Sequence, residues 1–184
     1  MVYEEKTVGK ESIYAGRIIN VEKLSVELPG GHRADREVVR HSAGVVCIPI
    51  SDDWRICMVE QYRIPFDCTM LELPAGKMDI DGETPLDAAV RELKEETGYT
   101  ADSMTEVVRA ASSPGFCDEI LHVFAARGLH KGEAEPDEDE FLDIKHFGID
   151  ELLRMIKDGK IRDAKSVIGI YYAALLKAKI INQD

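Results

Sequence analysis

Apolar and polar residues alternate along the first forty residues of the chain. The stretches SIYAGRIINVEKLSVEL and REVVRHSAG are separated by a turn at Pro29-Gly30-Gly31. Alternation with a period of two is typical of half-buried strands, so we predict an antiparallel β-meander here. The next two stretches, GVVCIPIS (44–51) and RICMVEQYR (55–63), are almost continuously apolar. They predict a hairpin of buried strands joined by the Asp-Asp-Trp turn.

The rest of the chain mixes strand and helix patterns. Strands are predicted at ILHVFAARGL (120–129) and at FLDIKHF, which follows an acidic loop, KGEAEPDEDE (131–140). Two helices are predicted to close the chain, at 149–160 and 163–180. Because strands and helices follow each other without a regular βαβ rhythm, the pattern favours an α+β fold over a doubly wound one.

The clearest helix is predicted to begin at Thr84 and to run to Thr97. Thr84 is a good capping residue, Pro85 suits the first helical position, and Asp87 completes a capping box. Gly98 is a typical C-terminal stop. At 100° per residue one apolar arc collects on this helix, and we expect it to be buried. It consists of Leu86, Ala89, Val90 and Leu93.

Three carboxylates, Glu92, Glu95 and Glu96, lie in a second arc beside the apolar one. Like charges one turn apart destabilise a helix, and partial burial raises that cost. A hard divalent cation such as Mg²⁺, which prefers oxygen ligands, would neutralise them. Arg91 on the flank can pair with a glutamate and fix its rotamer. The pattern therefore indicates a metal site, with a solvated charged face as the alternative.

The composition is that of one soluble domain with a full core. The chain has 184 residues, of which 45% are hydrophobic and 32% charged. Its net charge of −12 argues against general binding of nucleic acid or anionic membranes, although a solubilising surface accounts for most of that charge. Without a membrane-length apolar run or a signal-peptide pattern, we predict a cytoplasmic protein. Four cysteines without C-x-x-C spacing are predicted to be free thiols.

One segment resembles a known signature. It consists of Gly76, Glu83 and then Arg91-Glu92-Leu93-x-Glu95-Glu96-x-Gly98-Tyr99. This order is similar to the Nudix box, G-x5-E-x7-R-E-U-x-E-E-x-G-U, where U is a bulky apolar residue. Six residues rather than five separate Gly76 from Glu83, which shifts Glu83 relative to Gly76, but an added loop residue costs little. The chain is identified as a member of the Nudix hydrolase family, which implies an α/β/α sandwich with a mixed central sheet.

The resemblance also implies the chemistry. Nudix hydrolases cleave nucleoside diphosphates linked to another moiety, and they need Mg²⁺, for which Mn²⁺ can substitute. Two or more ions per site are implied, held by Glu92, Glu96, the backbone of Ala75 and Glu140. Glu95 and Glu96 are implied to be catalytic, with Glu95 reaching metal through water. Glu138 in the acidic loop is implied to be the general base, with Glu133 and Glu135 as rivals.

The flanking segments narrow the substrate class. REVVRHSAGVVCIPI, EQYR, LELPAGK, SSPGFCDE and RDAKSVIGIYY resemble the ADP-ribose pyrophosphatase subfamily, which implies hydrolysis of ADP-ribose to AMP and ribose 5-phosphate. The substrate-binding residues implied are Arg36, Glu37, Arg63, Met78, Ser113, Gly115 and Glu119. The alternatives are surface ion pairs for the arginines, packing for Met78 and an ordinary loop tip for the SSPGF loop.

Other substrates and another function stay open at this point. GDP-mannose, NADH and dinucleoside polyphosphate hydrolases share the box, and a non-catalytic nucleotide-sugar sensor is the rival of a different class. The resemblance further implies that residues 1–42 form a dimerisation element whose strands cross to a second subunit, with residues 43–184 as the Nudix domain. A strand-swapped homodimer is therefore expected.

Overall fold

The computed structural model describes residues 3–135 and 141–182. The chain divides into two compact units. The N-terminal unit comprises Met1–Ala43 and Ala111–Ile120. The second unit comprises Gly44–Ala110 and Leu121–Asp184, and we call it the catalytic unit because it contains the segment that resembles the Nudix box. The expected boundary after residue 42 lies close to the first of these divisions, but the segment 111–120 groups with the N-terminal strands.

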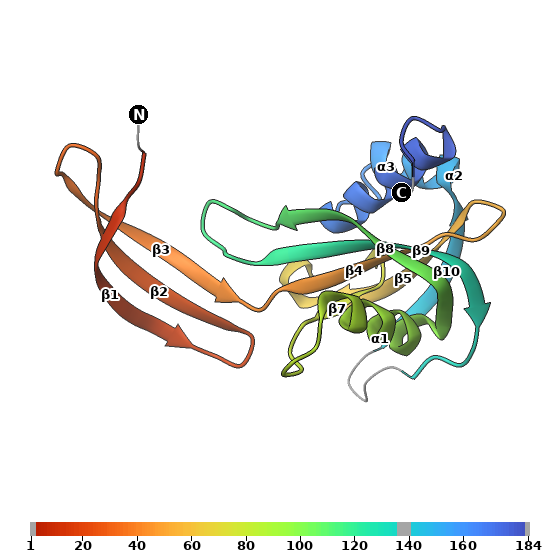
Figure 1. Cartoon of the computed structure of the whole chain (residues 1–184), viewed down its shortest axis with the longest axis horizontal. Helices are drawn as coiled ribbons and strands as arrows, with labels where there is room; N and C mark the ends of the chain where they lie inside the picture. Colours follow the sequence, from red (N-terminus) through yellow and green to blue (C-terminus); the bar gives the residue numbers. More distant parts are fainter. Residues whose placement is uncertain (1–2, 136–140, 183–184) are drawn as a thin grey trace. The chain divides into compact units, whose positions relative to one another are not determined.

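The N-terminal unit is a three-stranded antiparallel sheet, as the alternating pattern predicts. Its strands are β1 (Lys6–Ala15), β2 (Ile19–Glu27) and β3 (Arg33–His41), in the order β1-β2-β3 (Figure 1). The turn between β2 and β3 contains Gly30 and Gly31, both with positive φ (101° and 84°), which glycine adopts without strain.

This sheet has very little core of its own. Among the described residues of the unit, Val26 is the single hydrophobic side chain that is fully buried. Val8, Ile13, Tyr14 and Ile18 are all more than 40% exposed. A three-stranded sheet usually needs a covered hydrophobic face for independent stability, so this unit lacks a feature that most small sheets have.

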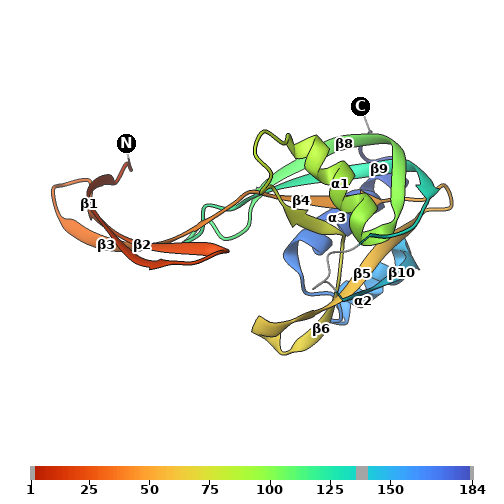
Figure 2. The same cartoon turned by 90° about the horizontal axis from the view of Figure 1, so that it is seen from below.

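In its described residues the catalytic unit contains two sheets and three α-helices, whose arrangement Figures 1 and 2 show. One sheet has the order β7-β4-β9-β8, and the other, with β6 at its edge, has the order β10-β5-β6. The elements are β4 (Gly44–Pro49), β5 (Arg55–Arg63), the 3₁₀ turn η1 (Ile64–Phe66), β6 (Cys68–Glu72), β7 (Ala75–Lys77), α1 (Pro85–Thr97), β8 (Tyr99–Ala111), β9 (Ile120–Lys131), β10 (Leu142–Gly148), α2 (Ile149–Lys157) and α3 (Ala164–Lys177). None of the helices is long and apolar enough to cross a membrane, among the residues described.

Strand β4 explains why helices cover both faces of its sheet. Its side chains alternate, so that Val45 and Cys47 join the cluster under α1 while Val46 and Ile48 join the cluster under α2 and α3. Figure 1 shows α1 on one side of the strands and α3 on the other. Since β4 pairs parallel with β9 and antiparallel with β7, the sheet is mixed, and the expected α/β/α sandwich is confirmed.

The α1 helix forms where the capping pattern predicts, but the prediction of its buried face was only half right: Ala89 and Leu93 are buried, whereas burial of Leu86 and Val90 was wrong. Leu86 and Val90 are 44% and 47% exposed. The buried face is formed by Ala88, Ala89, Leu93, Glu96 and Thr97. Small alanines let the helix approach β4 closely, and the Cys47 thiol donates a hydrogen bond to the Ala89 carbonyl at 3.2 Å. Helix geometry fixes which residues share a face, but the neighbouring strands decide which face is covered.

Candidate active site

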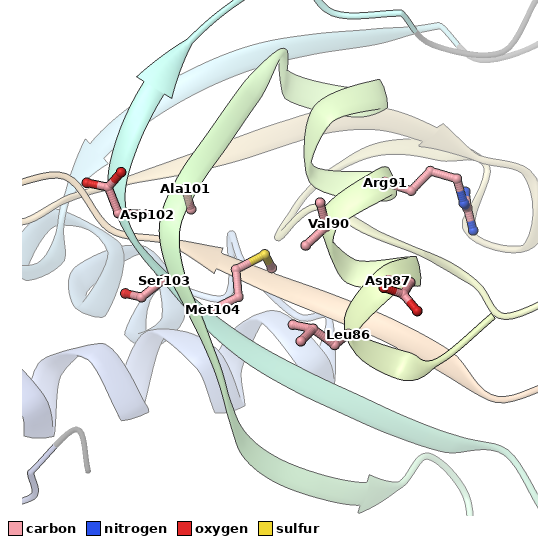
Figure 3. Close-up of a pocket in the computed structure, with 8 residues that line it drawn as sticks. All are labelled: Leu86, Asp87, Val90, Arg91, Ala101, Asp102, Ser103 and Met104. Atoms are coloured by element: carbon pink, nitrogen blue, oxygen red, sulfur yellow. The ribbon is translucent and has the colours of Figure 1, made fainter.

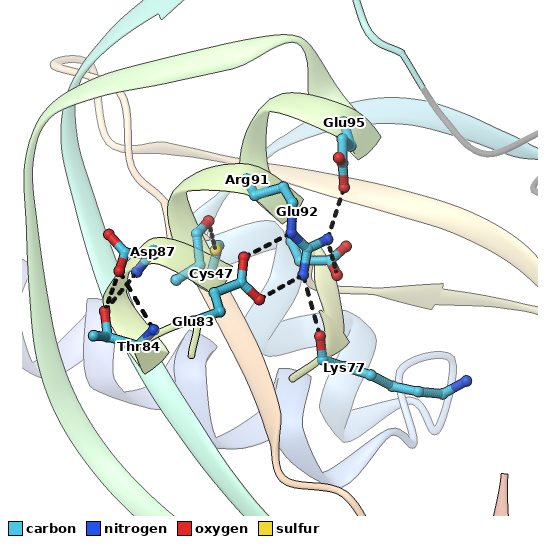
Figure 4. Close-up of polar contacts among 9 residues, drawn as sticks. Cys47, Lys77, Glu83, Thr84, Asp87, Arg91, Glu92 and Glu95 are labelled. Atoms are coloured by element: carbon cyan, nitrogen blue, oxygen red, sulfur yellow. Dashed lines mark hydrogen bonds and ion pairs between the residues drawn. The ribbon is translucent and has the colours of Figure 1, made fainter. Parts of the chain in front are cut away.

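Arg91 draws together three carboxylates of the box (Figure 4). Its Nε and Nη2 donate to the two oxygens of Glu83 at 2.8 and 3.1 Å. Its Nη1 donates to Glu92 Oε1 at 2.7 Å and to Glu95 Oε2 at 2.9 Å. Nη2 also reaches the Lys77 carbonyl at 3.2 Å. The hydrogen bond with Glu83, followed by those with Glu92 and Glu95, raises the pKa of Arg91, so the guanidinium is a permanent charge that orients the box.

The other side of the carboxylate cluster is the backbone of β7. The Ala75 N–H donates to Glu96 Oε2 at 3.0 Å, and Glu96 is only 3% exposed. A Cβ on Gly76 would overlap the carboxylate of Glu92, so a glycine at this position makes room for that side chain. The Cys47 N–H donates a hydrogen bond to the Pro74 carbonyl at 2.8 Å, so the residue before β7 is attached to β4. Glu92 and Glu96 therefore both lie against the strand that carries the expected Ala75 carbonyl ligand.

This donor set fits a hard divalent cation. Carboxylates and a backbone carbonyl are the oxygen ligands that Mg²⁺ prefers, and Gly76 leaves space for a carboxylate beside the carbonyl-bearing strand. Within residues 3–135 and 141–182, no group of three or more His, Cys, Asp or Glu side chains is arranged so that it could hold a metal ion. Arg91 forms ion pairs with Glu92 and Glu95 at 2.7 and 2.9 Å, so a metal ion would compete with Arg91 for their oxygens.

The extra residue between Gly76 and Glu83 is accommodated in a turn before the helix. The Glu83 N–H donates to the Ile80 carbonyl at 3.1 Å, Gly82 takes a φ of +82°, and Ile80 is 53% exposed. Glu83 still reaches Arg91 with both oxygens. The insertion therefore leaves the Glu83–Arg91 pair intact.

Arg63, at the end of β5, forms a two-pronged ion pair with Glu72 of β6. Its Nε and Nη2 donate to the two Glu72 oxygens at 2.8 and 2.9 Å. The hydrogen bond with Glu72 raises the pKa of Arg63, and the charge of Glu96 acts in the same direction. Arg63 thus lies within electrostatic reach of the box carboxylates, and its partner is a buried side chain rather than a surface one.

Met78 lies just after β7 and is partly buried. It packs against the cluster formed under α1, which includes Val45 and Leu93. This contact is the packing role given as the alternative for Met78, and a ribose contact stays a prediction.

Several predicted substrate residues belong to the N-terminal unit. Arg36 on β3 donates through Nε and Nη2 to the oxygens of Glu5 at 2.9 and 2.7 Å, and its neighbour Glu37 is exposed. Arg36 and Glu5 are both exposed, unlike the side chains around the box. The hydrogen bond with Glu5 raises the pKa of Arg36. The pair Arg36–Glu5 matches the alternative interpretation of a surface ion pair, and its role with substrate is untested.

The SSPGF segment lies along β3 within the same unit. The Ser113 carbonyl accepts hydrogen bonds from Phe116 and Cys117 N–H groups at 3.1 and 2.9 Å. A side chain at Gly115 would meet open space, so its glycine is not a steric requirement of the fold. Glu119 lies 3.4 Å from Nδ1 of His41. The structure thus brings Ser113, Gly115 and Glu119 together with β3.

The acidic loop is described only in part. Glu138 and Glu140, the expected base and fourth metal ligand, lie outside the described residues. The start of the loop is attached to the end of α1, because the Gly132 N–H donates to the Gly98 carbonyl at 2.8 Å and the Glu135 N–H donates to the Glu95 carbonyl at 3.0 Å.

The exposed side chains of Leu86 and Val90 border a shallow, partly apolar pocket that the sequence reasoning missed. It has a volume of about 400 Å³ and is lined by Leu86, Asp87, Val90, Arg91, Ala101, Asp102, Ser103 and Met104. Figure 3 shows Leu86, Val90 and Met104 facing this hollow while the Arg91 side chain points away from it. No helix-periodicity signal could have found the pocket, since the same residues form the arc expected to be buried.

Comparison with known proteins supports the resemblance in both units. The family described as NUDIX domain matches residues 40–168, and the family described as nucleoside diphosphate sugar hydrolase N-terminal domain matches residues 5–39. The "Methanol dehydrogenase activator" of Bacillus methanolicus is 45% identical over 179 residues, covering 96% of each chain. The "ADP-ribose pyrophosphatase" of Bacillus subtilis (strain 168) is 41% identical over 177 residues, covering 95% of each.

A solved structure, described as the crystal structure of ADP compounds hydrolase, has the same fold. Its TM-score is 0.86 at 24% identity, over 97% of both chains. The chain belongs to the Nudix family. The fold class is confirmed, as is the enzyme class, a Nudix pyrophosphohydrolase, and Nudix hydrolases generally depend on a divalent metal.

Proposed function

We propose that this protein hydrolyses the pyrophosphate bond of ADP-ribose or a similar ADP-sugar, releasing AMP and ribose 5-phosphate. The observation that carries the proposal is the convergence of Glu92 and Glu96 on β7, with Arg63 within electrostatic reach of Glu96. Support for the ADP-sugar comes from the B. subtilis relative and from the match to a nucleoside diphosphate sugar hydrolase N-terminal domain.

The carboxylates supply the metal site in this proposal. Two or more Mg²⁺ ions, or Mn²⁺ in their place, would be held by Glu92, Glu96, the Ala75 carbonyl and Glu140. When bound, the metal would neutralise the diphosphate and acidify a water molecule. Glu95 lies next to these ligands and is positioned by Arg91. Glu138 would take the proton from the attacking water, a role for which Glu133 and Glu135 are the rivals.

Substrate binding is proposed to involve both units. An arginine suits a diphosphate because its charge cannot be lost and its fork matches phosphate oxygens, which favours Arg36 and Arg63. Glu37, Met78, Ser113, Gly115 and Glu119 complete the proposed set. We further propose a homodimer in which the N-terminal strands cross to the second subunit. The support is that this sheet exposes Val8, Ile13, Tyr14 and Ile18 and has almost no core. The cytoplasmic location stays a prediction.

A panel of nucleoside diphosphate derivatives with product identification tests the substrate. ADP-ribose should be cleaved with the highest kcat/KM, against GDP-mannose, NADH and a dinucleoside polyphosphate, and activity should vanish in EDTA and return with Mg²⁺ or Mn²⁺. A preference for GDP-mannose would replace the proposed substrate. Binding without turnover of any compound would instead favour the nucleotide-sugar sensor.

The homodimer is tested by removing residues 1–42 and measuring the mass in solution by light scattering. The proposal expects a full-length dimer and a shortened chain that is monomeric and inactive. A shortened chain that is monomeric and fully active would refute the contribution of the N-terminal strands to the site.

A further inference from the structure

The last residue of β6, Glu72, is a buried carboxylate held by two cations. It is 3% exposed. Arg63 of β5 takes both of its oxygens, and Lys165 of α3 forms an ion pair with Oε2. The Lys165 ammonium also contacts Asp163 at 2.9 Å. These four side chains all belong to the catalytic unit, and neither Glu72 nor Lys165 has a part in the proposed chemistry so far.

The two cations keep Glu72 ionised. Burial by itself would raise its pKa, but the hydrogen bond from Arg63 and the charge of Lys165 outweigh that effect, so its pKa lies below the ordinary value. A buried carboxylate with one cationic partner is already neutralised. Lys165 therefore does more than stabilise ionised Glu72. Because Lys165 and Arg63 share the negative charge of Glu72, that charge does not act on Arg63 alone.

Lys165 is itself fixed by the start of α3. Asp163 caps the helix by accepting a hydrogen bond from the Ser166 N–H at 3.0 Å, and this helix terminus partly offsets its negative charge. The Ser166 hydroxyl oxygen accepts a hydrogen bond from the Leu73 N–H at 2.7 Å, which ties α3 to the residue after Glu72. Lys165, with a side chain only 13% exposed, thus has little freedom to leave Glu72.

Arg63 keeps one edge for a ligand. Glu72 engages Nε and Nη2, whereas Nη1 forms no hydrogen bond with any described residue, and the side chain is 38% exposed. A pocket of about 210 Å³ is lined by both cations and both carboxylates of this cluster, Arg63, Lys165, Glu72 and Asp163, together with Pro65, Phe66 and Met70. Arg63 also lies within electrostatic reach of Glu96, the expected metal ligand.

We propose that Glu72 and Lys165 are positioning residues for Arg63. Glu72 fixes the guanidinium plane by two hydrogen bonds, and Lys165 shares the charge of Glu72, so that Arg63 presents its Nη1 edge to the diphosphate of the substrate. The proposal rests on the proposed function, because it assigns Arg63 to the substrate diphosphate.

The test compares Lys165→Met with Lys165→Arg and with a matched control. Lys165→Met should raise KM for ADP-ribose about 10-fold, a typical effect of losing a contact to a charged group, while kcat stays nearly unchanged. Lys165→Arg retains the charge and should restore KM. Lys145→Met is the control, since it removes another ion pair of a β5-containing sheet, Lys145–Glu60. Equal KM values for the Lys165→Met and Lys145→Met variants would overturn the proposal.

A double-mutant cycle asks whether Lys165 acts through Arg63. If it does, adding Lys165→Met to an Arg63→Met protein should change KM little, whereas independent action would give additive effects and contradict the proposal. Thermal unfolding of each variant separates a binding defect from a folding defect. Calorimetry measures the dissociation constant of α,β-methylene-ADP-ribose with Mg²⁺ for the same four proteins, so the cycle is also tested without turnover. If the wild-type protein binds ADP-ribose without hydrolysing it, the proposed function is refuted. The dissociation constants of the variants still test the role of Lys165 in that case.

Discussion

The N-terminal and catalytic units use different forces to hold their strands. The catalytic unit buries two apolar clusters, one on each face of β4, and two buried carboxylates, Glu72 and Glu96, lie beside them. The N-terminal unit buries Val26 and otherwise links its strands by ion pairs, such as Lys10 and Arg40 with Glu22. Exposed ion pairs contribute little stability. The difference teaches that burial of apolar side chains stabilises the catalytic unit, whereas the N-terminal unit relies mainly on the hydrogen bonds and ion pairs between its strands.

The largest effect is expected from a comparison of one buried carboxylate in each unit, Glu96 in the catalytic unit and Glu22 in the N-terminal unit. Glu96→Gln should lower kcat at least about 100-fold, as losses at metal sites do, because the amide cannot replace an anionic ligand. The fold should survive, since the amide oxygen can still accept the Ala75 N–H. Glu22→Gln should keep most of the activity, because Glu22 pairs with Lys10 and Arg40 rather than with the box.

Steady-state kinetics with circular dichroism as a folding check measure both variants. Near-normal activity of the Glu96→Gln protein would remove Glu96 from the metal site. A comparable loss in the Glu22→Gln protein would erase the proposed division of labour between the two buried carboxylates.

The next effect concerns apolar side chains, one buried under α1 and one exposed on β1. Leu93→Ala in the core under α1 should lower the free energy of unfolding by about 2–5 kcal/mol, because a cavity is left behind. Ile13→Ala in β1, where the side chain is 56% exposed, should cost less than about 0.5 kcal/mol in a monomer.

Urea unfolding followed at several protein concentrations measures this pair. If the loss of unfolding free energy in the Ile13→Ala protein depends on protein concentration, a second copy covers β1, and the N-terminal unit then differs from the catalytic unit in being stabilised by association. Equal losses in the two proteins at every concentration would contradict the contrast between the units.

A smaller effect is expected from two glycines at helix ends within the catalytic unit. Gly98 and Gly159 have nearly the same φ, 72° and 70°, so alanine should cost roughly 1 kcal/mol of backbone strain at either site. A Cβ at position 98 would also lie 2.7 Å from the Ala134 nitrogen, whereas at position 159 it meets nothing within 4 Å. Gly98→Ala should therefore be the more destabilising by about 1–3 kcal/mol.

Thermal unfolding compares these two variants, and kinetic assays add a second readout. Because the loop 132–135 is attached to α1 beside Gly98, Gly98→Ala should also lower kcat, and Gly159→Ala should not. Identical unfolding curves would mean that the loop backbone moves aside without cost.

The smallest effect concerns a charge cluster on β8. The hydrogen bond from Arg109, helped by one from His122, lowers the pKa of Glu106 to about 2. Since the folded pKa is below the unfolded one, this pair stabilises the fold above about pH 4.5 and loses its effect as the pH falls toward 2. Arg109→Ala should move the pKa of Glu106 back toward its ordinary value, as an NMR titration of the carboxylate would measure. An unchanged titration would show that Arg109 is not the dominant partner.

Local patterns predicted the positions of the elements well because they depend on neighbouring residues. They did not predict strand pairing: the expected hairpin of 44–51 and 55–63 was wrong, since β4 and β5 lie in different sheets. The capping box at Thr84 and Asp87 and the stop at Gly98 placed α1 between Pro85 and Thr97. Alternation placed β1 to β3, and the box spacing, together with the flanking segments, indicated the enzyme family. The C-terminal helices end earlier than predicted, at Lys157 and Lys177, because Gly159 and Lys179 adopt left-handed conformations with φ of 70° and 57°.

The sequence by itself determined which residues could act, because the types and spacing of Arg91, Glu92 and Glu96 are set along one helix. Only the tertiary structure decided which face of α1 meets β7, and so left Leu86 and Val90 exposed while Glu96 is buried. It also brought Lys165 to Glu72, which are 93 residues apart. Helical periodicity acts over a few residues, whereas burial and ion pairing depend on strands and helices that meet only after folding.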